Sequence, residues 1–147
     1  MAGQVDGKIA LVTGGGSGIG RSTSLALARE DAKVVVSDVV VEGGEETVSL
    51  IKNDGGDAAF VQTDVAQATE VEALVKKTVD TYGRLDCAFN NAGIAGAAAR
   101  TGDYQEKHWD RVIAINLTGV WLCMKYELQH MLTQGSGAMS TPLLSPG

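Results

Sequence analysis

The sequence has few of the residues that mark several classes of protein. Its 147 residues include only two cysteines, two prolines and 5% aromatic residues. Cys87 and Cys123 have no CxxC partner and no histidine at ligand spacing, which excludes a disulfide framework and predicts no metal site. Because both cysteines stand in apolar runs, we expect two buried thiols.

Long apolar runs, leader segments and excess positive charge are absent as well. No apolar stretch approaches the length of a membrane span, and Met1–Asp6 lacks the basic and apolar regions of a signal peptide, which favours a cytoplasmic protein with no membrane partner. Twelve Lys and Arg against 18 Asp and Glu give a formal net charge of -6. A nucleic-acid binder needs a basic face that displaces counterions from phosphates, so we expect no nucleic-acid partner.

The composition that remains is that of an ordinary globular chain, with 44% hydrophobic and 20% charged residues and a length that suits one domain. Short β-rich apolar runs alternate with segments of helical spacing. Continuously apolar strands are typical of a parallel sheet covered on both faces. We therefore predict an α/β fold, a doubly wound parallel sheet with helices on both faces and its first four strands in the order 3-2-1-4. The expected strands are 8–14, 33–38, 58–62 and 85–89. The expected helices are 19–29, 44–53 and 69–83, with one or two further helices over 109–132.

Glycines cluster between the first strand and the first helix. Residues 13–20 read TGGGSGIG, where glycines let the backbone approach a pyrophosphate and the helix N-terminus attracts it. The spacing differs from GxGxxG and fits TGxxxGxG, and no GK[ST] follows, which excludes a phosphate-binding NTPase loop. The predicted dinucleotide-binding residues here are Gly14, Ser17, Gly18, Ile19 and Gly20.

A carboxylate ends the second expected strand. Asp38 can accept hydrogen bonds from an adenosine ribose and would repel the extra phosphate of NADP, so we predict NAD as the cofactor. The alternative is that a polar residue merely ends the strand.

Four motifs in this order resemble the short-chain dehydrogenase/reductase family. Beside TGxxxGxG and Asp38, Asp64-Val65 is similar to the family's adenine-contacting pair, and residues 90–93 are similar to its NNAG motif. Each motif follows an expected strand, where open α/β sheets bind ligands. The resemblance spans 7–138 and implies a Rossmann-like sheet whose later strands this chain lacks. It adds Asp64, Val65, Asn90, Ala92 and Gly93 to the predicted cofactor-binding residues.

The resemblance also implies a reaction, reversible hydride transfer between NAD(H) and a small-molecule secondary alcohol or ketone. Asn116 matches the family's catalytic asparagine, which holds a water in a proton relay; a helix-bending or hydrogen-bonding role alone is the alternative. The family's acid/base is a tyrosine in YxxxK with an upstream serine, and both are missing. Tyr82, Tyr104 and Tyr126 are followed at the fourth position by Asp86, His108 and His130.

The histidines and the large apolar residues of the last expected helices are predicted to have structural rather than catalytic roles. His108 and His130 occupy amphipathic helical positions with no nucleophile nearby, so we give them no catalytic role. Trp109, Trp121 and Met124 are predicted to pack in the core or in an interface.

Two helix ends carry local signals. Thr69 precedes Glu72 by three positions, which is the spacing of a capping box. Asp31 stands where the family usually has glycine after the first helix. A left-handed residue there costs about 1 kcal/mol at most, because Asp tolerates this conformation better than most residues.

A fifth strand is due after residue 138, but 139–147 contains both prolines and little β character. We predict an NAD-binding domain over 1–138 and an aberrant tail over 139–147. Codons allowed for 138–147, with one base inserted, encode AIVNTASVAG, which resembles the family's fifth strand and puts its serine at Leu144. A single-base slip is therefore one hypothesis, beside a natural truncation and a sequencing error.

Two functions follow from the sequence. The first is an NAD(H)-binding short-chain oxidoreductase that is inactive in this form, because it lacks the serine and YxxxK. The alternative is a nucleotide-binding or subunit-interaction module without turnover. Since the last long helix helps form a dimer interface in the family, a homo-oligomer through this helix is a further expectation.

Overall fold

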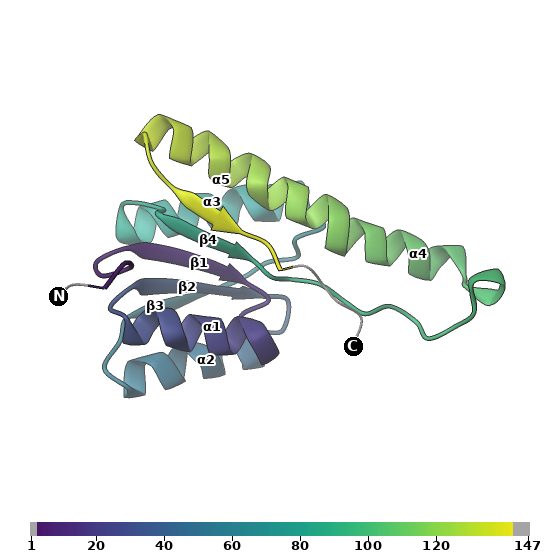
Figure 1. Ribbon diagram of the computed structural model, residues 1–147, viewed down its shortest axis with the longest axis horizontal. Coiled ribbons are helices and arrows are strands. Elements are labelled where there is room, and N and C mark those ends of the chain that lie inside the picture. Colours follow the sequence, from purple (N-terminus) through teal and green to yellow (C-terminus); the bar gives the residue numbers. More distant parts are fainter. Residues whose placement is uncertain (1–2, 143–147) are drawn as a thin grey trace.

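Five strands form one parallel sheet in the computed structural model, which describes residues 3–142 (Figure 1). Their order is β3-β2-β1-β4-β5, which confirms the predicted order of the first four. Leu11 of β1 lies in register between Val35 of β2 and Ala88 of β4. The strands are β1 (Ile9–Thr13), β2 (Lys33–Asp38), β3 (Ala58–Gln62), β4 (Cys87–Asn90) and β5 (Ala138–Ser140).

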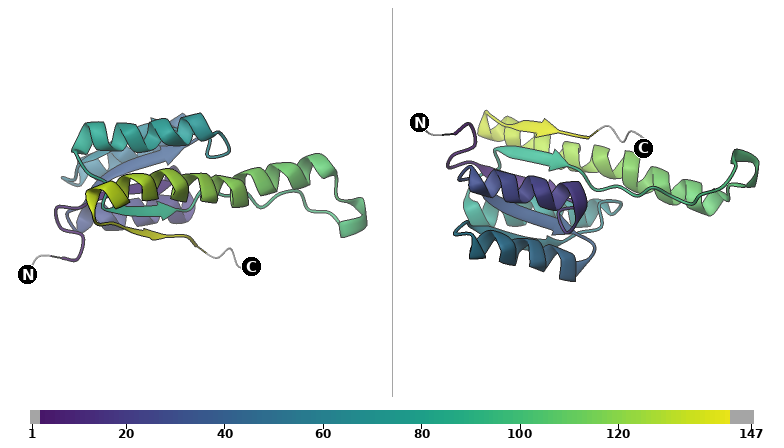
Figure 2. Two further views of the ribbon diagram at one scale, coloured as in Figure 1. Left: turned by 90° about the horizontal axis from the view of Figure 1, so that it is seen from above. Right: turned by 60° about the horizontal axis from the view of Figure 1, so that its bottom comes forward.

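Helices cover both faces of this sheet, as the sequence predicts (Figures 1 and 2). Two lie against one face, α1 (Gly18–Arg29) and α2 (Val41–Asn53), and two lie against the other, α3 (Ala68–Tyr82) and α5 (Val120–Gln134). The remaining elements are a short 3-10 turn, η1 (Thr101–Asp103), then α4 (Glu106–Ile113) and the π-helical segment η2 (Ala114–Gly119), which lead directly into α5 and extend past the sheet.

Neighbouring residues of one strand enter two different cores. Leu11 packs with Leu74 of α3 and Met131 of α5, whereas Val12 packs with Val48 and other apolar residues on the α2 side. Both faces of the central strands are thus removed from water. This double burial is the physical reason that the strands are continuously apolar rather than alternating.

The end of the described chain corrects one expectation. Strand pairing does not stop at Ala138: β5 pairs in parallel with β4, and Ser140 lies opposite Phe89. Pro142 lies two residues after Ser140, the last paired residue, so its missing N–H removes no hydrogen bond from the ladder. The rest of the predicted tail, 143–147 with Leu144, lies outside the described residues, and both the domain boundary and the frameshift stay predictions.

The predicted capping box is wrong. Helix α3 begins at Ala68 with Gln67 at its N-cap, and Thr69 already lies inside the first turn, where its hydroxyl makes no cap. Glu70 instead accepts a hydrogen bond from the backbone N–H of Asp64, at 3.2 Å. A carboxylate in the first turn also suits the helix dipole.

One burial prediction is corrected: Cys123 is buried, but Cys87 is only partly buried. Trp109 and Trp121 do not belong to the core, since 60% and 57% of their surfaces are exposed. Packing in an interface, the other predicted environment, stays a prediction for both. Helical spacing can define an apolar face, but spacing alone does not say whether another element covers that face. Among residues 3–142, no helix is long and apolar enough to cross a membrane.

Asp31 adopts the left-handed conformation that the sequence suggests, with a φ of 67°, and is the one non-glycine residue of positive φ in the described chain. We expect Asp31→Gly to stabilise the protein by about 1 kcal/mol, because glycine adopts this φ without a Cβ penalty. The melting temperature should rise by roughly 3 °C in a chain of this size. Asp31→Ala is the matched control and should lower the melting temperature, since alanine tolerates this φ less well than Asp. Equal melting temperatures for the three proteins would contradict the strain argument.

Candidate functional site

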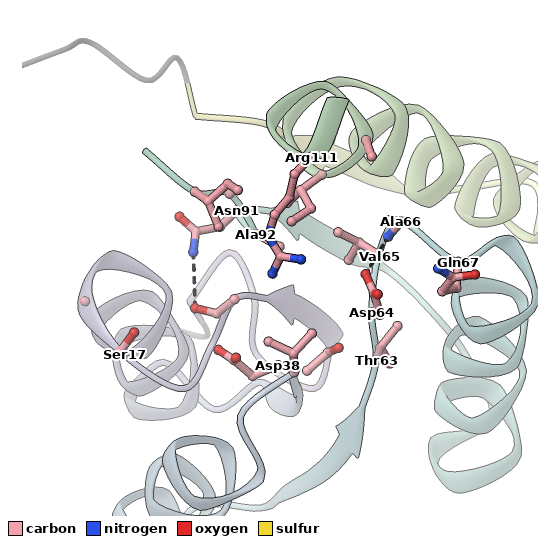
Figure 3. Close-up of a pocket in the computed structure, with 18 of the residues that line it drawn as sticks. Ser17, Asp38, Thr63, Asp64, Val65, Ala66, Gln67, Asn91, Ala92 and Arg111 are labelled. Atoms are coloured by element: carbon pink, nitrogen blue, oxygen red, sulfur yellow. Dashed lines mark hydrogen bonds between the residues drawn. The ribbon is translucent and has the colours of Figure 1, made fainter. Parts of the chain in front are cut away.

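A cleft of about 1040 Å³ opens at the carboxyl ends of the strands (Figure 3). Parallel strands bring these ends to one edge of the sheet, so segments far apart in the sequence meet there. The loops after β1, β2, β3 and β4 form the floor and walls, and α4 with η2 closes one side. Nine of the predicted site residues line this cleft: Gly14, Ser17, Gly18, Ile19, Asp38, Asp64, Val65, Ala92 and Gly93. Gly20, Asn90 and Asn116 do not.

The glycine turn brings backbone close to backbone under the cleft. Gly14 has a φ of 63°, which glycine adopts without strain. A Cβ on Gly20, in the first turn of α1, would collide with the carbonyl group of Gly14. Gly20 therefore shapes the glycine turn beneath the cleft, although it does not line the cleft itself. The first residues of α1, Gly18 and Ile19, do line it, at the helix end that leaves N–H groups without intrahelical partners.

The carboxylate of Asp38 is fixed at the cleft by two backbone donors. The N–H of Gly16 donates to Oδ2 at 2.9 Å, and the N–H of Val40 donates to Oδ1 at 3.0 Å. The first contact joins the end of β2 to the glycine turn. A negative group thus lines the cleft in a defined position, where it can accept hydrogen bonds from ribose hydroxyls.

Asp64 and Val65 form the next part of the wall. Asp64 accepts a hydrogen bond from the N–H of Ala66 at 2.9 Å, which shapes the turn between β3 and α3. Val65 is 5% exposed and packs with Leu122 and Cys123 of α5. One aliphatic side chain thereby packs in the core and also lines the cleft.

The loop after β4 is anchored to β1. The hydroxyl oxygen of Thr13 accepts hydrogen bonds from the N–H groups of Asn91 and Ala92, at 3.0 and 3.1 Å. The Asn91 amide donates to the carbonyl groups of Thr13 and Gly14, both at 3.3 Å. Asn90, by contrast, is 2% exposed and turns away from the cleft toward Glu127 of α5.

Asn116 uses its side chain to hold the same loop. Its amide donates to the carbonyl of Ile94 at 2.8 Å, and its carbonyl oxygen accepts from the Ile94 N–H at 2.9 Å. It lies in the π-helical segment η2, a type of helix that is rare and often found at functional sites. The side chain thus makes a structural contact; the water-holding role stays a prediction.

Sequence reasoning missed the residues that α4 contributes. Lys107, Asp110 and Arg111 line the cleft, and Arg111 extends from α4 into it (Figure 3). With Ala114 they follow the i, i+3, i+4, i+7 spacing of one helix face, which the sequence contains. That spacing defines a face but does not reveal that the cleft lies beneath it.

Arg21 was missed as well. From α1 it donates to the carbonyl groups of Gly16 and Gly43, at 2.7 and 3.2 Å, and to the Thr47 hydroxyl at 3.0 Å. It also forms an ion pair with Glu46 at 2.9 Å. One side chain therefore ties the glycine turn to α2, a contact that no local motif indicates.

A family model described as short chain dehydrogenase matches residues 8–139. The chain belongs to the short-chain dehydrogenase family. This confirms the resemblance that the motifs suggested. Among curated proteins of the family, the short chain dehydrogenase/reductase astE of Aspergillus oryzae is 43% identical over 134 residues, which are 90% of this chain and 51% of astE. The cyclohexanol dehydrogenase of an Acinetobacter species is 42% identical over 139 residues, or 95% and 55% of the two chains.

Solved structures of short-chain dehydrogenases share the fold. The crystal structure of NAD+-bound xylitol dehydrogenase has a TM-score of 0.92 and 34% identity, over 95% of this chain and 54% of that one. That of levodione reductase has a TM-score of 0.91 and 37% identity, over 94% and 54%. The chain spans about half the length of the curated relatives it matches.

Proposed function

We propose that the chain binds NAD(H) in the cleft and forms the nucleotide-binding half of an oxidoreductase that transfers hydride between NAD(H) and a secondary alcohol or ketone. The observation that carries this proposal is the Asp38 carboxylate, held at the cleft by Gly16 and Val40. It can accept hydrogen bonds from two ribose hydroxyls, and its negative charge repels a 2′-phosphate, which favours NAD over NADP. The relatives named cyclohexanol dehydrogenase and xylitol dehydrogenase support an alcohol or ketone substrate.

The residues present fit a dinucleotide. The collision that a Cβ on Gly20 would cause leaves room only for glycine beneath the turn, so the backbone can come close to a pyrophosphate. Val65 offers an apolar wall for adenine, while Arg111 extends from α4 into the cleft and adds positive charge. When bound, the nicotinamide group supplies or accepts the hydride; the protein binds and orients it.

We further propose that these 147 residues bind the cofactor without turnover. A tyrosine with a pKa near 10 needs about 4 kcal/mol of help to act at neutral pH. None of the three tyrosines lines the cleft. Burial and the neighbouring Asp57 raise the pKa of Tyr82 further, and the Tyr104 hydroxyl accepts a hydrogen bond from Ala97 at 3.2 Å.

NAD should raise the thermal stability of the purified chain. A ligand that binds only the folded state, at one hundred times its dissociation constant, adds about 2.7 kcal/mol to the free energy of unfolding. NADP at the same concentration should give a smaller shift, because its 2′-phosphate meets Asp38. Differential scanning fluorimetry measures both. The absence of any shift with NAD argues against the proposed cofactor site, and turnover of alcohols by the chain alone argues against the second proposal.

A subunit-interaction module is the second candidate, and an exposed apolar face favours it. Leu117, Trp121, Leu128 and Leu132 are 63%, 57%, 42% and 78% exposed, and their spacing of four, seven and four residues keeps them on one side of η2 and α5. Such a face is typical of a contact between subunits. Light scattering of the purified chain tests whether two copies associate.

A further inference from the structure

Glu127 is a fully buried acid within the apolar side of α5. None of its surface is exposed, and the other buried residues of α5, Leu122, Cys123 and Met131, are apolar. The amide Nδ2 of Asn90, the last residue of β4, donates a hydrogen bond to its Oε1 at 2.7 Å. Burial raises the pKa of Glu127 to about 7, and the bond from Asn90 offsets this in part. A charge here would be costly, because no cation faces it among its described contacts.

Two buried oxygen atoms of this pair have no hydrogen-bond partner in the described structure: Oε2 of Glu127 and Oδ1 of Asn90. An ionised carboxylate only accepts hydrogen bonds, so it cannot satisfy the Asn90 oxygen. A protonated carboxyl has one O–H donor. A single proton on Oε2 would therefore satisfy both atoms at once, and acid and amide would face each other through two parallel hydrogen bonds.

We propose that Glu127 carries a proton up to about neutral pH, donates it in a hydrogen bond to Oδ1 of Asn90, and so acts as a positioning residue for the loop that forms the cleft floor. We name these two side chains the acid–amide pair. The proposal stands on the geometry of the buried pair and on its place at the start of this loop.

Three anchors hold the loop of residues 90–94, and the acid–amide pair is the first of them. Thr13 holds the second point through the N–H groups of Asn91 and Ala92, and Asn116 holds the third through Ile94. Asn91, Ala92 and Ile94 all line the cleft. Loss of the proton leaves a buried charge and an unpaired amide oxygen beside this loop, which should shift its first residues.

No charged group in the described part of the chain contributes to the pKa of Glu127, which burial and the hydrogen bond from Asn90 determine. The buried residues of α3, which packs against α5, are Val71, Leu74, Val75 and Thr78, none of them ionisable, and η2 contributes no ionisable group. On α5 itself, burial and Glu127 raise the pKa of the Cys123 thiol to about 12, so this thiol stays neutral. The pKa of Glu127 in the folded protein lies above the usual value for Glu. The protonated acid–amide pair therefore stabilises the fold fully below about pH 4.5, and this stabilisation is lost as the pH rises through about 7.

Glu127→Gln is the decisive variant, because glutamine mimics the protonated acid. Its amide N–H can donate to Oδ1 of Asn90 while its oxygen accepts from Nδ2. We expect the melting temperature of the wild type to fall by several degrees, relative to that of the variant, between about pH 5 and about pH 8. The infrared difference spectrum at about pH 5 should show a protonated carboxyl C=O band that Glu127→Gln lacks. The control is Glu72→Gln, an exposed position on α3, which should leave both readouts unchanged.

Positioning is tested on the ligand-free protein by nuclear magnetic resonance. The amide signals of Asn91 and Ala92 should shift through about pH 7 in the wild type and stay constant in Glu127→Gln. If the melting temperatures of the wild type and of Glu127→Gln change in parallel with pH, and the infrared spectrum shows no protonated carboxyl band, Glu127 does not carry the proton. If the band titrates but the amide signals of Asn91 and Ala92 do not move, Glu127 does not position the loop. A resulting pH dependence of NAD affinity rests on the proposed function. If NAD does not bind the wild type, the proposed NAD-binding function is wrong. The measurements on the ligand-free protein still test the proton on Glu127 and its positioning role.

Discussion

Gly20→Ala should abolish measurable NAD binding and lower the free energy of unfolding by about 3 kcal/mol. The added methyl group would fall on the carbonyl of Gly14 and on the amide of Asn91. The carbonyl belongs to the backbone and cannot rotate away. It also accepts the hydrogen bond from Asn91, so relief of the collision would move the glycine turn and the loop after β4 together. Urea unfolding measures the first effect, and isothermal titration with NAD measures the second.

Gly102→Ala is the matched control for this substitution. Gly102 lies in η1, where a Cβ meets nothing within 4 Å. Alanine there should leave NAD binding unchanged and should stabilise the chain slightly, by about 0.5 kcal/mol, because it restricts the unfolded state. If Gly20→Ala and Gly102→Ala give the same stability and the same affinity, the close approach under the cleft has no functional importance.

Asp38→Ala should weaken NAD binding by about 10- to 100-fold, since a charge-assisted hydrogen bond contributes about 1.5–3 kcal/mol. The same change should narrow the preference for NAD over NADP, because the 2′-phosphate no longer meets a carboxylate. Removal of the carboxylate also frees the N–H groups of Gly16 and Val40. Titrations with NAD and NADP under identical salt conditions give both ratios. An unchanged ratio of the NAD and NADP affinities would contradict the role of Asp38 in cofactor choice.

Asp38→Asn removes the negative charge of the side chain but keeps its size and shape, so it separates the two effects. The asparagine oxygen can still accept one of the two backbone hydrogen bonds, but it carries no charge. We therefore expect Asp38→Asn to keep more stability than Asp38→Ala, while its preference for NAD falls by a similar factor. If only Asp38→Ala loses the preference, the effect comes from the displaced glycine turn rather than from electrostatic repulsion.

Local signals predicted the sheet well and the helix ends less well. The runs of β-branched residues in 9–13 and 33–38 are apolar throughout because both faces of β1 and β2 are buried, and this pattern needs no tertiary information. The start of α2 was missed by three residues, since Val41 and Glu42 carry no distinctive cap. The left-handed Asp31 was predictable from the end of α1, because the requirement there is local to one residue.

The sequence by itself determined the α/β class, the order of the first four strands, the family and nine residues of the cleft, because the glycine turn, Asp38, Asp64-Val65 and the loop after β4 each follow their strand directly. Only the tertiary structure decided what distant elements add. Arg111 reaches the cleft because α4 folds over it, and Glu127 meets Asn90 across 37 residues of sequence. These contacts depend on how helices pack on a finished sheet. No local pattern specifies that packing, since a buried acid on an otherwise apolar helix face has no motif until its partner is in place.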